Sequence, residues 1–119
     1  MKNFKNLIVW QRSMELASET TNVVSKLPNK ERFTYRDQII RSSISIPSNI
    51  AEGCSRESRK DFKRFLRLSL GSSFELETHL LLLEQNKLIK SEYLQTAFGF
   101  NEEVQKMLQT LIKKINLAP

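Results

Sequence analysis

Residues 43–80 read SISIPSNIAEGCSRESRKDFKRFLRLSLGSSFELETHL. The first part is typical of a helix of small side chains, which Pro47 interrupts because proline has no backbone N–H to donate. We expect a kink at Pro47 and a helix end at Gly53, where glycine suits a left-handed conformation. Ser58 is a good N-cap for a longer helix, with the acidic Asp61 three residues later. The stretch therefore predicts two helices joined by a short turn.

The longer helix, expected from about residue 58 to residue 86, carries a regular seam that should face the core. Its members are spaced alternately four and three residues apart: Phe62, Leu66, Ser69, Ser73, Leu76, Leu80 and Leu83. Leu70, Phe74 and Leu81 form a second apolar stripe about 100° away from this seam. One bundle face does not need a second stripe, so these three residues are the candidate oligomer interface. Another copy of the same chain is the simplest partner.

The rest of the sequence completes a set of four helices. The first is expected over residues 6–26 and is stopped by Pro28; its seam is Leu7, Trp10, Met14, Ala17, Thr21 and Val24. The small-residue helix should begin near residues 32–35. The last helix should follow a Ser91 cap, with the seam Leu94, Ala97, Asn101, Val104, Leu108, Leu111 and Ile115. The short connections predict an all-α, antiparallel up-down-up-down four-helix bundle, kinked near Pro47, with one domain over residues 1–119.

Composition agrees with a small helical protein. The 119 residues include only three glycines and three prolines, too few for many hairpins. The single cysteine, Cys54, cannot form an internal disulfide, which suits a reducing compartment. The N-terminus has no secretory signal pattern, and no apolar run is long enough to span a membrane. We therefore expect a cytoplasmic protein with no membrane partner.

Positive charge is concentrated in one short stretch. The chain has a net charge of +6, and residues 56–67 hold six basic and two acidic side chains. Such a concentration attracts phosphate backbones or acidic surfaces, although most charge runs are only solvated faces. The candidate nucleic-acid-binding residues are Arg41, Arg56, Arg59, Lys60, Lys63, Arg64 and Arg67.

Catalytic chemistry finds little support in the sequence. His79 is the only histidine, so the two Glu-x-x-His elements of a ferritin-like di-metal site are missing. Cys54 has no Cys-x-x-Cys partner for zinc, and the chain has no glycine-rich phosphate cradle. We expect no enzyme activity, no catalytic residue, no metal and no cofactor. His79 is expected to be a half-buried packing residue.

Three segments carry a resemblance to a known family: LIVWQRSMEL at 7–16, DQIIRSSISIPSNIAEG at 37–53 and RFLRLSLGSSFELETHL at 64–80. They are similar to the 23S rRNA intervening-sequence proteins, also labelled four-helix-bundle or S23-type proteins. The resemblance implies a small bacterial helical bundle and a homopentamer, because many members are five-membered rings. The accessory protein of diversity-generating retroelements, a basic pentamer that binds nucleic acid and a reverse transcriptase, is also similar. Leu70 and residues 85–89 depart from the family's usual pattern.

Two classes of function remain open. The first is a non-enzymatic, oligomeric module that binds the RNA or DNA backbone through the basic face of the longer helix. Such binding would be salt-sensitive and poorly sequence-specific, because phosphate contacts position a protein without reading bases. The alternative is a structural scaffold that docks an acidic protein partner. The response of RNA and DNA binding to salt would distinguish the two classes.

Overall fold

The computed structural model describes residues 3–117, and the side chains of these residues except 30–33 and 117. Four helices make up almost all of this region: α1 (Ile8–Ser25), α2 (Asn29–Cys54), α3 (Arg59–Gln85) and α4 (Gln95–Leu117). Short 3-10 turns at Phe4–Asn6 and Ser91–Tyr93 precede α1 and α4. The predicted all-α, four-helix architecture is confirmed.

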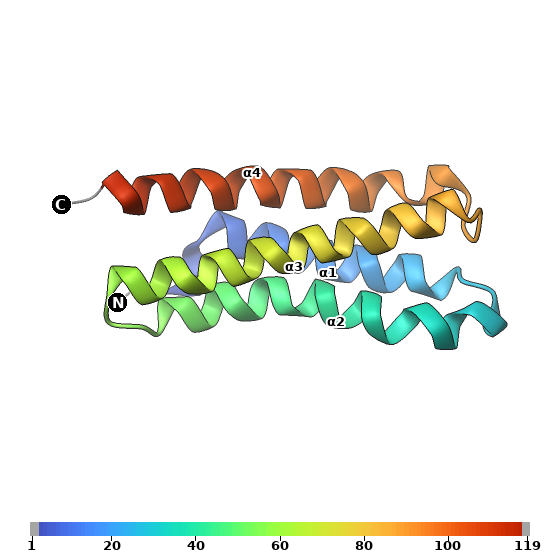
Figure 1. The fold of residues 1–119 in the computed structure, drawn as a ribbon, viewed down its shortest axis with the longest axis horizontal. Coiled ribbons are helices and arrows are strands. Elements are labelled where there is room, and N and C mark those ends of the chain that lie inside the picture. The colour runs from blue at the N-terminus through green and yellow to red at the C-terminus, as the bar shows by residue number, and fades with distance from the viewer. Residues whose placement is uncertain (1–2, 118–119) are drawn as a thin grey trace.

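Consecutive helices run in opposite directions along a molecule of 50 × 20 × 20 Å (Figure 1). Each helix packs against its neighbours in the chain, and α4 closes the bundle by packing against α1. The start of α3 therefore shares one end of the bundle with the ends of α2 and α4. The α3–α4 connection lies at the other end, where Lys26 Nζ sits 4.8 Å from the centre of the Tyr93 ring.

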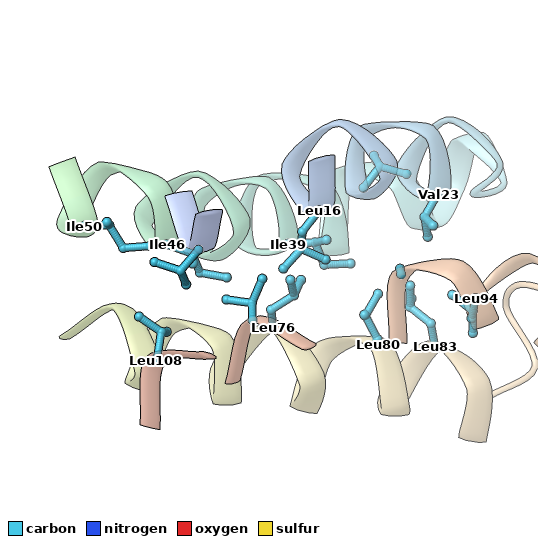
Figure 2. Close-up of a cluster of buried hydrophobic side chains, with 14 of the residues drawn as sticks. Leu16, Val23, Ile39, Ile46, Ile50, Leu76, Leu80, Leu83, Leu94 and Leu108 are labelled. Atoms are coloured by element: carbon cyan, nitrogen blue, oxygen red, sulfur yellow. The ribbon is translucent and has the colours of Figure 1, made fainter. Parts of the chain in front are cut away.

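The core forms where the apolar faces of the four helices meet. Figure 2 shows side chains from α1 and α2 pointing toward side chains from α3 and α4. All seven residues of the predicted α3 seam are buried, so that seam is confirmed. Ser58 caps α3 as expected, because its side chain accepts a hydrogen bond of 3.1 Å from the Asp61 backbone N–H.

Helix α1 turns a different face to the core from the one that its sequence pattern suggested. The buried face is shifted by one residue and consists of Val9, Ser13, Leu16, Thr20, Val23 and Val24. Met14 is 44% exposed, and Trp10 is only half-buried. Ser13 and Thr20 can face the core because their hydroxyls donate to the carbonyl oxygens of Trp10 and Leu16, at 2.7 and 2.8 Å. Of the predicted seam, Val24 is fully buried and Leu7 and Trp10 pack against the core from half-buried positions, so the prediction is wrong at the exposed Met14 and Thr21.

Two buried serines connect α3 to the helices on either side of it. Ser69 Oγ donates to the carbonyl oxygen of Ile46 in α2, at 2.9 Å. One turn later, Ser73 Oγ donates to Asn101 Oδ1 in α4 at 2.6 Å, and Asn101 Nδ2 donates back to the Ser73 carbonyl oxygen at 3.1 Å. These bonds join the helices at defined heights and satisfy polar groups that would be costly to bury unpaired.

Helix α2 is longer than expected at both ends. It begins at Asn29, directly after Pro28, and runs through Pro47 and Gly53 to Cys54. No described glycine has a positive φ angle, so the predicted left-handed helix end at Gly53 is wrong. Gly53 instead permits a close approach of α3, because a Cβ atom there would lie 2.9 Å from the Phe65 Cβ. The kink at Pro47 stays a prediction.

We predict that Gly53→Ala lowers the free energy of unfolding by about 1–3 kcal/mol, because the added methyl overpacks the α2–α3 contact. Gly71→Ala and Gly99→Ala are matched controls, since a Cβ at either position would meet nothing within 4 Å. Both controls should raise the free energy of unfolding by about 0.5–1 kcal/mol. Urea titration followed by circular dichroism measures all three. Equal stabilisation by all three changes would contradict the steric role of Gly53.

We also predict that Ser73 and Asn101 are energetically coupled. Ser73→Ala and Asn101→Ala should each cost about 1–3 kcal/mol, because each leaves a buried polar partner without its hydrogen bond. The double variant should cost about 1 kcal/mol less than the two single costs added together. A double-mutant cycle by urea titration checks this. Simple additivity would show that the pair contributes only packing.

Candidate nucleic-acid interface

Six of the seven predicted binding residues lie together around the α2–α3 turn and the first three turns of α3. Arg56, Arg59, Lys60, Arg64 and Arg67 are exposed, and Lys63 is half-buried. The seventh, Arg41, lies in the middle of α2, where its guanidinium is 3.2 Å from Glu75 Oε2 of α3. The structure therefore separates Arg41 from the other six, and we call those six the basic face.

Two arginines of the basic face form exposed ion pairs. Arg56 pairs with Glu52 at 3.1 Å, and Arg64 lies 3.9 Å from Asp61. Exposed pairs of this kind contribute about 0–1 kcal/mol, so a phosphate could replace either carboxylate at little cost. Among the described residues, no carboxylate forms an ion pair with Lys60 or Arg67. These two cations are the most available for an anionic ligand.

Phe65 positions two of the arginines. It is buried, and the guanidinium carbons of Arg56 and Arg64 lie 4.7 and 4.4 Å from the centre of its ring. Cation–π contacts of this kind hold guanidinium groups over a ring while leaving their N–H groups free to donate. This role of Phe65 is not visible in the sequence, where its only distinguishing feature is its place directly before Leu66 of the seam.

Helix α4 adds lysines to the same end of the bundle. Lys63 Nζ at the start of α3 donates to Asn116 Oδ1 near the end of α4, at 2.8 Å. This contact places Lys113 and Lys114 at the same end of the bundle as the basic face, although they are about fifty residues away in sequence. The sequence alone does not show that these lysines lie near the start of α3, because their position depends on the antiparallel packing of α3 against α4.

Charge is segregated along the bundle. The half that contains the basic face consists of residues 3–15, 44–73 and 105–117, with eleven basic and four acidic side chains. The other half, residues 16–43 and 74–104, has seven basic and nine acidic side chains. A field of this shape attracts polyanions to one end of the molecule.

Arg12 marks the boundary between the two halves. Its guanidinium bonds Glu15 of α1 through Nη1 and Glu103 of α4 through Nε, both at 2.9 Å. The hydrogen bond with Glu15, followed by the negative charge of Glu103, raises the pKa of Arg12. Arginine is protonated throughout the neutral range, so this bridge between α1 and α4 persists there.

The described residues offer no assembled metal site. No group of three His, Cys, Asp or Glu side chains in this region could hold a metal ion. His79 Nε2 lies 3.4 Å from Glu75 Oε2, in the half of the bundle away from the buried Cys54. None of the helices, over the residues described, combines the length and apolar character needed to cross a membrane.

Two of the three candidate oligomer-interface residues are well exposed. Phe74 and Leu81 are each 47% exposed on α3, whereas Leu70 is half-buried against the core and offers less surface. A second apolar surface, which we call the α1–α2 groove, was not predicted, although its α1 residues belong to the predicted seam of that helix. It encloses about 370 Å³ and is lined by Phe4, Trp10, Met14, Ala17, Ile44, Pro47, Ser48 and Ala51.

Comparisons with known proteins identify the relatives of this chain. The family described as 23S rRNA-intervening sequence protein matches residues 5–110. A crystal structure of a protein of unknown function from the S23 ribosomal protein family of Bacteroides thetaiotaomicron is similar, with a TM-score of 0.83 and 33% sequence identity. The similarity covers 89% of this chain and 99% of that one. Among curated proteins, none matches. The chain therefore belongs to the 23S rRNA-intervening sequence protein family.

Proposed function

We propose that this protein is a non-enzymatic module that binds the backbone of RNA or DNA through its basic face. The observation that carries the proposal is the charge segregation, with eleven basic and four acidic side chains in one half of the bundle. Lys60 and Arg67, which have no ion pair among the described residues, and the stacked Arg56 and Arg64 present donors on one surface. Phe65 is buried, so the recognition uses phosphates without base stacking.

We expect a labelled RNA hairpin and a matched DNA duplex to bind, with affinity falling about a hundredfold between ~50 and ~200 mM salt if four phosphates are contacted. Changing Lys60, Lys63, Arg64 and Arg67 to glutamate should abolish binding of both. Fluorescence anisotropy measures each titration.

The matched control changes Lys26, Arg36, Lys87 and Lys90 to glutamate, which alters the net charge equally in the other half of the bundle. This variant should keep most of the affinity. Equal loss in both variants would show that net charge alone drives binding. Absence of binding at low salt would refute the proposal and favour the alternative scaffold that docks an acidic protein.

We further propose that the protein is a homo-oligomer, for which the resemblance of the sequence favours five-fold symmetry. Its support is the pair of apolar surfaces on different sides of the bundle, namely the α1–α2 groove and the exposed Phe74 and Leu81. Two different surfaces on one chain suit a head-to-tail contact, which closes into a ring when the rotation allows. The single, buried Cys54 is consistent with a cytoplasmic location, which we also propose.

Light scattering at micromolar concentration should give a mass well above the 13.9 kDa of one chain. Phe74→Glu with Leu81→Glu should reduce it to one chain, because buried, unpaired carboxylates are costly. Glu92→Gln with Glu102→Gln, both exposed and outside the two apolar surfaces, is the control and should leave the mass unchanged. A 13.9 kDa species for the unmodified protein would contradict the oligomer proposal.

A further inference from the structure

Helix α1 leaves part of α4 uncovered. It has 18 residues, whereas α2, α3 and α4 have 26, 27 and 23. In Figure 1 the start of α1 is set back from the end of the bundle where α3 starts and α4 ends. The last turns of α4 therefore lack a full helical neighbour on that side.

A groove of about 550 Å³ fills this position, between the start of α1 and the end of α4. Leu7, Ile8, Met107 and Leu111 contribute its apolar surface, and Ile8 is 62% exposed. Lys106 and Lys114 stand along the same groove. We call this surface the α1–α4 groove; an exposed apolar surface bordered by charge is typical of an interaction site.

The separation of the two lysines and the weakness of the ion pair at Lys106 make both available to bind carboxylates of a partner. They are eight residues apart on α4, which is about 12 Å along the helix. Lys106 pairs with Glu102 at 3.0 Å, but both side chains are largely exposed, so the pair is weak and exchangeable. Among the described residues, no carboxylate pairs with Lys114.

We propose that the α1–α4 groove binds an acidic amphipathic helix of a partner protein. A two-turn apolar stripe would cover Ile8, Met107 and Leu111, and carboxylates about 12 Å apart would meet the two lysines. The half of the bundle around the groove is strongly basic, so charge complementarity favours a negatively charged partner helix. A nucleic-acid backbone would match the lysines but would leave the apolar floor without a partner.

The groove is separate from the basic face. Helix α1 packs against α2 and α4, so it lies across the bundle from α3. The partner helix and a nucleic acid could therefore bind the same chain at the same time. The inference does not depend on nucleic-acid binding and goes beyond the proposed function.

The test uses two labelled, alanine-based helical peptides that share one leucine stripe. The first carries two glutamates eight residues apart beside the stripe, and the second carries lysines at those positions. The acidic peptide should bind in fluorescence anisotropy, and the basic peptide should not. Lys106→Glu with Lys114→Glu should weaken the acidic peptide about tenfold and reverse the preference in favour of the basic one.

Two controls make the outcome specific. Lys87→Glu with Lys90→Glu makes the same charge change at the other end of the bundle and should leave the preference unchanged. Ile8→Gln, at a largely exposed position, should weaken binding of the acidic peptide several-fold. The absence of peptide binding, an equal effect of the Lys87/Lys90 variant, or no reversal of preference would each overturn the proposal. A change of mass in light scattering for the Lys106/Lys114 variant would instead assign the groove to contacts between copies.

Discussion

Helix α3 is held between its two neighbours by hydrogen bonds from serines one turn apart, Ser69 to α2 and Ser73 to α4. Small side chains at these positions let the helix axes come close, and the hydroxyls find acceptors that the close approach brings within reach. Gly53 extends the same contact to the end of α2, where a methyl group would collide with Phe65. Because polar groups must be satisfied at fixed heights, these contacts select one register of α3 among several that apolar packing alone would permit.

The register of α3 determines where the charges lie. It brings the start of α3 beside the end of α4, as the contact between Lys63 and Asn116 shows. The positive side chains of two distant segments therefore lie at one end of the bundle, while acidic residues predominate in the other half. The buried Phe65 contacts two arginines of the basic face, so one residue at the edge of the core also positions part of the charged exterior.

The bundle has more apolar surface than its core uses. The α1–α2 groove, the exposed Phe74 and Leu81, and the α1–α4 groove lie on different sides of the molecule. The first two are the surfaces proposed for contacts between copies, and no charged side chain lines the α1–α2 groove. The third carries two lysines and suits an acidic partner. A small bundle with several such surfaces suits the proposals that it assembles with copies of itself and with a partner.

The sequence by itself determined the four helices, the core face of α3, the Ser58 cap and the main part of the basic face. These features depend on periodicity, capping and local charge, which are properties of neighbouring residues. Only the tertiary structure decided which face of α1 is buried, because that helix has two apolar faces and its core-facing Ser13 and Thr20 satisfy their own hydroxyls. It also decided the role of Gly53 and the addition of the α4 lysines to the basic end. Periodicity identifies residues that share a face, but only the packing of one helix against another determines what that face meets.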